Sequence, residues 1–126
     1  RVLPALPAFW CGILYDDDSL DAAWDIAKSW TTEERRKLRD DVPKLGFKAS
    51  IRNRDVLNLS TELLGIAKRG LERRKRLDRT GHDETLYLRP LEEIVSRGTT
   101  PAETMLERYR ESWGRSVDPI YSEFAY

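Results

Sequence analysis

A mainly α-helical fold of about five helices is predicted by three features of this sequence. Apolar residues recur at three- and four-residue spacing in several segments, which is typical of the buried face of an amphipathic helix. Two segments start with the capping-box pattern of a helix, at Thr31 to Glu34 and at Thr100 to Glu103. Charged residues make up 35% of the 126 residues, which favours helices with polar outer faces. A chain of this length is expected to form a single unit over residues 1–126.

The first third of the chain contains three predicted helices. The first runs through Phe9 to Leu14 with Pro7 in its first turn, although its aromatic and β-branched residues also suit an extended segment. The second follows an acidic turn and carries a helical stripe made of Leu20, Ala23, Trp24, Ala27 and Trp30. The third starts at Thr31 and should end at Pro43. Residues 44–53 are then expected to form a loop.

The longest helix is predicted over residues 54–79, and Gly70 inside it should cost about 1 kcal/mol relative to alanine. A turn over residues 81–84 and a short helix ending at Gly98 follow. The helix capped at Thr100 should reach Trp113, and the aromatic residues after it are expected to dock the segment 116–126 on the body. The buried stripe of the longest helix should consist of Val56, Leu59, Leu63, Ile66, Ala67 and Leu71.

Composition argues against several classes of function. Lys+Arg and Asp+Glu both number 22, so the formal net charge of zero provides no field that attracts nucleic acid or an anionic membrane. Cys11 is the only cysteine, so no disulfide forms within the chain. The longest apolar stretch, residues 8–15, is too short to span a bilayer, and no signal peptide is recognisable. Cytoplasmic residence is therefore expected, and the first residue, Arg1, suggests processing or a longer parent protein.

Most of the residues that suggest chemistry also have a structural interpretation, which we favour. The acidic turn Asp16 to Asp18 suits helix capping better than cation binding, because three adjacent carboxylates do not converge on one point. His82 should lie on the surface, and Cys11 should be a small buried apolar residue. The tryptophans are interpreted as core aromatics: Trp10, Trp24, Trp30 and Trp113.

Two groups of basic residues remain. The late part of the longest helix carries a basic run that we interpret as a solvated face or a surface for an acidic neighbouring domain, since no aromatic residue is interleaved for base stacking. Lys48, Arg52 and Arg54 follow Gly46, and cations on such a segment can converge on a polyphosphate. The P-loop pattern is absent. The basic run consists of Lys68, Arg69, Arg73, Arg74, Lys75, Arg76 and Arg79.

Several short motifs follow one another along the chain in the same order as in one known enzyme family. Residues 6–16 read LPAFWCGILYD, where that family has LPAFW-x-GLLYD. Residues 18–20 with the helix start at Trp30, residues 100–103, the WGRSVDPIY of residues 113–121 and the terminal Tyr126 match in the same order. The chain therefore resembles plant-type and proteobacterial glutamate–cysteine ligases, and the resemblance covers essentially the whole chain.

This resemblance implies the C-terminal helical portion of a larger α+β ligase of glutamine-synthetase-like type. The family uses ATP and Mg²⁺ to join glutamate and cysteine into γ-glutamylcysteine through a γ-glutamyl phosphate, the first step of glutathione synthesis. Segments that supply the magnesium carboxylates lie outside the matched portion, so no metal ligand is assigned here. The chain is expected to be inactive alone and to need the N-terminal portion of the ligase as its partner. A non-catalytic helical interaction module derived from that ligase is the alternative.

The resemblance also bears on the basic loop. Where the family usually has GLKTPFR, this chain has GFKASIR over residues 46–52. Lys48 and Arg52 are kept, whereas the Thr-Pro pair is replaced by Ala49 and Ser50. Lys48 and Arg52 are therefore predicted to contact the nucleotide phosphates or a substrate carboxylate in the complete enzyme. No catalytic residue is assigned.

Overall fold

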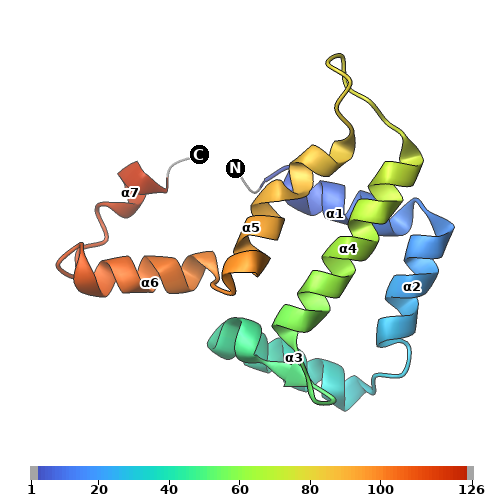
Figure 1. The fold of residues 1–126 in the computed structure, drawn as a ribbon. Coiled ribbons are helices and arrows are strands. Elements are labelled where there is room, and N and C mark those ends of the chain that lie inside the picture. The colour runs from blue at the N-terminus through green and yellow to red at the C-terminus, as the bar shows by residue number, and fades with distance from the viewer. Residues whose placement is uncertain (1–2, 125–126) are drawn as a thin grey trace.

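A computed structural model describes residues 3–124 and confirms a mainly α-helical fold (Figure 1). Seven α-helices, two short 3₁₀ segments and one two-stranded antiparallel hairpin make up the described residues. In chain order they are α1 (Ala5–Leu14), α2 (Asp17–Ala27), α3 (Thr32–Leu45), η1 (Gly46–Lys48), β1 (Ser50–Ile51), β2 (Arg54–Asp55), α4 (Val56–Arg74), η2 (Glu84–Leu88), α5 (Arg89–Arg97), α6 (Pro101–Glu111) and α7 (Ile120–Glu123).

The body of the fold is built around the crossing of α1 and α4, where two glycines bring the backbones together (Figure 1). A Cβ atom on Gly70 would lie 1.8 Å from the carbonyl oxygen of Gly12, and one on Gly12 would lie 2.1 Å from that of Ala67. No side chain fits at either position. The glycine inside the longest helix, unfavourable for helix formation, is therefore required by packing.

Apolar side chains from α1, α4 and η2 form the core next to this crossing. Ser19 of α2 is also buried there, and its Oγ donates a hydrogen bond to the carbonyl oxygen of Ile66 over 3.2 Å. The predicted stripe of α4 is largely confirmed, with Leu64 buried more fully than Leu63. The core cluster consists of Ala8, Ile13, Leu64, Ile66, Ala67, Leu71 and Leu88.

The helix starts follow the predicted capping chemistry. Both capping boxes, at Thr31 and at Thr100, are present in full. Asp16 caps α2 by accepting a hydrogen bond from the Ser19 N–H over 3.0 Å, and hydrogen bonding to Ser19 holds the pKa of that carboxyl below its usual value. The interpretation of the acidic turn as a helix cap is confirmed. The α1 segment is helical, with Pro7 in its first turn, so the extended alternative is wrong.

Three predicted boundaries are wrong. Helix α3 continues two residues beyond Pro43 and ends at Leu45, because a proline in the last turn keeps a helical φ and sacrifices only one hydrogen bond. Helix α4 ends at Arg74, before the left-handed Lys75, and not near residue 79. Helix α6 ends at Glu111 and does not include Trp113. Periodicity and capping residues thus predicted where the helices lie better than where they end.

Only one of the four tryptophans, Trp113, is buried, and Trp30 is half-buried and lies outside the core cluster. Trp10 on α1 is 55% exposed and Trp24 on α2 is 60% exposed, so their assignment as core residues is wrong. Trp113 is buried, but it packs edge-on against Phe124 and donates a hydrogen bond from Nε1 to Glu123. The C-terminal segment therefore docks on the end of α6 and not on the body, from which α6 and α7 extend (Figure 1).

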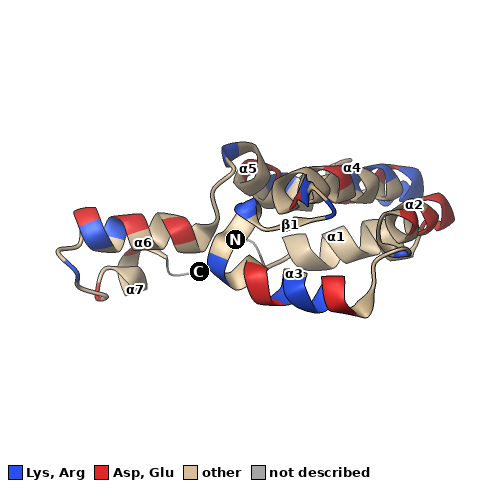
Figure 2. Cartoon of the chain, turned by 90° about the horizontal axis from the view of Figure 1, so that it is seen from below, with Lys and Arg blue, Asp and Glu red and all other residues tan. Residues whose placement is uncertain are grey.

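Charged residues of both signs lie side by side on α3, α4 and α6 (Figure 2). The basic run of α4 is partly neutralised within the chain. Lys68 pairs with Glu92 over 2.8 Å, and Arg74 pairs with Glu84 over 3.1 Å. Arg73 bridges two carboxylates of the acidic turn. Within residues 3–124, every helix is too short or too polar to cross a bilayer.

Candidate functional site

The segment predicted to be a basic loop contains a small β-hairpin. Ser50 pairs with Asp55 and Ile51 pairs with Arg54, which leaves Arg52 and Asn53 as a two-residue turn. Both turn residues have positive φ, 49° and 62°, as a type I′ turn requires. Since neither is glycine, the usual sequence signal of such a turn is missing. The hairpin places Arg52 at its tip, and the side chain of Ile51, which precedes the turn, is buried.

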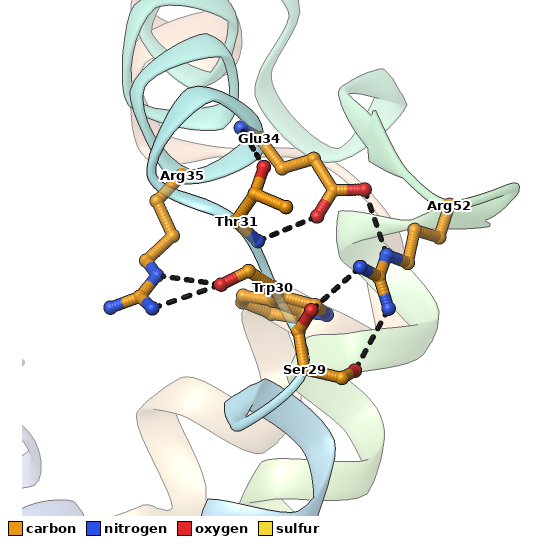
Figure 3. Close-up of polar contacts among 6 residues, drawn as sticks. All are labelled: Ser29, Trp30, Thr31, Glu34, Arg35 and Arg52. Atoms are coloured by element: carbon orange, nitrogen blue, oxygen red, sulfur yellow. Dashed lines mark hydrogen bonds and ion pairs between the residues drawn. The ribbon is translucent and has the colours of Figure 1, made fainter.

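The Arg52 guanidinium makes three polar contacts with the connection between α2 and α3 (Figure 3). Its Nε donates to Glu34 Oε1 over 2.7 Å. Its Nη1 donates to the Ser29 hydroxyl over 2.8 Å, and its Nη2 donates to the Ser29 carbonyl oxygen over 2.6 Å. Arg52 therefore joins the hairpin to a helix junction eighteen or more residues earlier in the chain.

Glu34 links this contact to the capping box of α3. Its Oε2 accepts from the Thr31 N–H over 2.8 Å, while its Oε1 accepts from Arg52 (Figure 3). The hydrogen bond from Arg52 is the main reason that the pKa of Glu34 lies below its usual value, and the same contact raises the pKa of Arg52. On the other side of the junction, Arg35 donates two hydrogen bonds to the Trp30 carbonyl oxygen.

Lys48 has different neighbours from Arg52. It lies exposed at the end of η1, and its ammonium group makes no hydrogen bond or ion pair with any of residues 3–124. Its charge contributes to the lowered pKa of Glu103 near the start of α6, after the larger effect of hydrogen bonds from Thr100. The structure thus places Lys48 towards α6 and Arg52 against the α2–α3 junction. The structure therefore does not bring the two cations together at one site. Their role in binding phosphate stays a prediction.

The remaining candidates are occupied or exposed. Arg54 pairs with Glu62 on α4. His82 is exposed in the turn after α4, and its Nδ1 lies 2.8 Å from the Thr80 hydroxyl. Cys11 is half-buried against the core. Over the part of the chain that the structure describes, no three His, Cys, Asp or Glu residues are grouped so that they could hold a metal ion.

The fold and the hairpin define the class of this chain as a small helical unit in which an arginine at the hairpin tip is hydrogen-bonded to the α2–α3 junction. Comparison with known proteins then gives the family, because the sequence model of the family described as glutamate-cysteine ligase family 2 matches residues 1–123. The chain belongs to glutamate-cysteine ligase family 2. The resemblance inferred from the motifs is confirmed.

Curated relatives in this family are similar over the whole chain. It is 46% identical over 126 residues to a chloroplastic glutamate–cysteine ligase of Arabidopsis thaliana and 47% identical to that of Solanum lycopersicum. It is 45% identical to the chloroplastic glutamate–cysteine ligase A of Oryza sativa subsp. indica. In each case all of this chain is aligned, but it spans only 23% of the first two relatives and 24% of the third. Cytoplasmic residence remains a prediction.

Proposed function

We propose that this chain is the C-terminal helical portion of an ATP-dependent glutamate–cysteine ligase that forms γ-glutamylcysteine through a γ-glutamyl phosphate. The observation that carries the proposal is the 46% identity over all 126 residues to a glutamate–cysteine ligase. In the proposed enzyme, ATP and Mg²⁺ are the cofactors, glutamate and cysteine are the substrates, and the N-terminal portion of the ligase supplies the carboxylates for magnesium. Residues 3–124 provide a helical scaffold with exposed cations.

Lys48 is the residue of this chain best suited to contact a phosphate or a substrate carboxylate. Its ammonium group is exposed, and no carboxylate within residues 3–124 forms an ion pair with it. An ammonium group offers three donors to an anion. Binding of this kind accelerates phosphoryl and acyl transfer mainly by positioning the substrate and neutralising charge.

Arg52 can contribute to the proposed site in a more limited way. Three of its five N–H groups are used by Ser29 and Glu34, so two remain for an anion. The nearby Glu34 carboxylate offsets much of its positive charge. This arrangement favours a positioning role, in which Arg52 holds the hairpin and thereby the segment that carries Lys48. It also suits the alternative, a non-catalytic helical interaction module derived from the ligase.

The first experiment compares the 126-residue chain with the complete ligase in an assay that contains ATP, Mg²⁺, glutamate and cysteine. The complete ligase should form γ-glutamylcysteine. The isolated chain should form none, because in this proposal the carboxylates for magnesium belong to the N-terminal portion. Product from the isolated chain above a buffer control would contradict its role as a dependent portion. A complete protein without ligase activity would favour the interaction module.

The second experiment tests Lys48 in the complete ligase with a matched control. Lys48→Ala should lower turnover by roughly 10- to 1000-fold if its ammonium faces developing charge. Lys44→Ala removes an equal charge from an exposed position four residues earlier and should leave turnover unchanged. Equal kinetics for both variants would exclude a role of Lys48 in the reaction.

Arg52→Lys separates binding from positioning, because it keeps the charge and loses the planar fork. A positioning role predicts that this variant lowers the thermal unfolding midpoint together with turnover. Loss of turnover with an unchanged midpoint and a raised KM for ATP would instead indicate direct contact with the nucleotide. If neither the midpoint nor the kinetics change, Arg52 has neither role.

A further inference from the structure

Helix α1 is apolar around its whole circumference. Its sequence, ALPAFWCGIL, contains no charged side chain, and Figure 2 shows it without the red and blue segments that mark α3 and α4. A helix of a globular protein that is apolar on all sides is normally buried on all sides. In residues 3–124, however, α1 is buried on one side only.

The two sides of α1 differ sharply in exposure. Ala5, Gly12 and Ile13 are buried towards α4 and the core. On the opposite side, the residues of one stripe at four-residue spacing are all more than half exposed, and we call them the α1 outer stripe: Leu6 at 54%, Trp10 at 55% and Leu14 at 53%. Four-residue spacing puts these side chains on one helix face, so they form a continuous apolar ridge.

An apolar groove opens beside one end of this ridge. It has a volume of about 220 Å³ and is lined by residues of α1, η1, α4 and α5, which include Leu6, Phe9, Phe47, Leu63, Leu91 and Ile94. Sites for small molecules usually have volumes of about 300–1,000 Å³ and a few convergent polar groups. This groove is smaller, and apolar side chains make up nearly all of its lining. It therefore suits inserted apolar side chains better than a charged amino acid or a nucleotide.

We propose that α1 is an internal helix of the complete ligase, and that an apolar face of the ligase polypeptide outside this chain covers the α1 outer stripe and the groove. This inference rests on the proposed function. The remainder of the ligase is the occupant that we infer, because more than three quarters of each compared relative lies outside the region that this chain spans. Insertion into a membrane does not explain the stripe, since ten residues are about half of what a bilayer-spanning helix needs.

Hydroxyl-radical footprinting of the complete ligase tests the covering directly. The oxidation rate of each side chain is divided by its rate in the urea-unfolded ligase, which removes differences in intrinsic reactivity. Trp113, which is 8% exposed, serves as the buried reference of the same residue type, and Leu77, which is 66% exposed, serves as the exposed reference. The proposal predicts that Trp10 is protected to the same degree as Trp113, although it is 55% exposed in this chain.

The alternative occupants give different results in the same experiment. Protection of Trp10 that disappears on dilution, as an oligomer dissociates, would assign the surface to a second copy and overturn the proposal. Protection only in the presence of phosphatidylcholine vesicles would assign it to a membrane and also overturn it. A normalised oxidation rate of Trp10 equal to that of Leu77 would show that the α1 outer stripe is uncovered, and it would overturn the proposal. The γ-glutamylcysteine assay stays independent, so an active ligase with an exposed Trp10 refutes this inference alone.

A pair of substitutions provides a second readout in the complete ligase. Leu14→Ala removes part of the α1 outer stripe, and Leu77→Ala makes the same change at an exposed position beyond the end of α4. If the stripe is covered, Leu14→Ala should lower the unfolding midpoint by about 2 °C or more, as cavities in the interior of large domains do. Leu77→Ala should leave it unchanged. Equal midpoints for the two variants would overturn the proposal.

Discussion

Replacing Gly70 with alanine should destabilise the protein, although helix propensity alone predicts the opposite. Alanine is favoured over glycine inside a helix by about 1 kcal/mol. At this position, however, the new Cβ would lie 1.8 Å from the carbonyl oxygen of Gly12, about half of the ordinary contact distance. The clashing atom belongs to the backbone and cannot rotate away. Helix α1 must therefore move off α4, and overpacking of this kind costs about 1–3 kcal/mol or more.

The close backbone clash places the overpacking cost in the upper part of its usual range, and the gain in helix propensity offsets about 1 kcal/mol of it, so the prediction is a net loss of about 1–2 kcal/mol in the free energy of unfolding. Gly65→Ala is the matched control on the same helix, because a Cβ there would meet only the end of the Arg69 side chain at 3.6 Å. That change should stabilise the protein by up to about 1 kcal/mol. Urea denaturation of the 126-residue chain, followed by circular dichroism, measures both variants. Stabilisation by Gly70→Ala would refute the close crossing of α1 and α4.

Three further predictions concern the core and the helix starts. Leu71→Ala should lower the free energy of unfolding by about 2–5 kcal/mol in urea denaturation, because this side chain is fully buried and leaves a cavity. Thr100→Ala should cost about 1 kcal/mol, seen as faster amide hydrogen exchange in the first turn of α6, whereas Thr99→Ala should not change it. The third concerns Glu34, whose folded-state pKa is lowered, so its stabilising effect is present above the usual value of 4.5 and is lost as the pH falls through the folded-state pKa. Thermal unfolding midpoints measured across this acid range should fall less steeply for Glu34→Gln than for the unchanged protein, and equal slopes would contradict the Arg52–Glu34 contact.

The sequence was most informative where a few neighbouring residues determine the structure. The capping boxes at Thr31 and Thr100 and the left-handed Gly98 after α5 were predicted correctly. Each depends on backbone groups within three or four residues. The end of α4 was not predicted, because the residue after it that adopts the left-handed conformation is Lys75 and not the glycine that usually marks such a position.

In the candidate site, too, the sequence predicted the local features but not the contacts between distant residues. Sequence reasoning selected Lys48 and Arg52 as cations on one segment, and it identified Glu34 as part of a capping box. It could not predict that the second oxygen of Glu34 accepts from Arg52, because that contact joins residues eighteen positions apart. It also missed the hairpin that brings Arg52 there, since a turn of Arg52 and Asn53 lacks the glycine that usually marks the type I′ conformation.

By itself, the sequence determined the helical class, the main helix starts and the family, because capping, periodicity and ordered motifs are written in local residue order. Only the tertiary structure decided which apolar residues are covered. The spacing of Trp10 and Trp24 was compatible with a core position, yet both are exposed, while Gly70 is required at the centre of the packing. Burial depends on which helices meet and how closely, and periodicity within one helix does not contain that information.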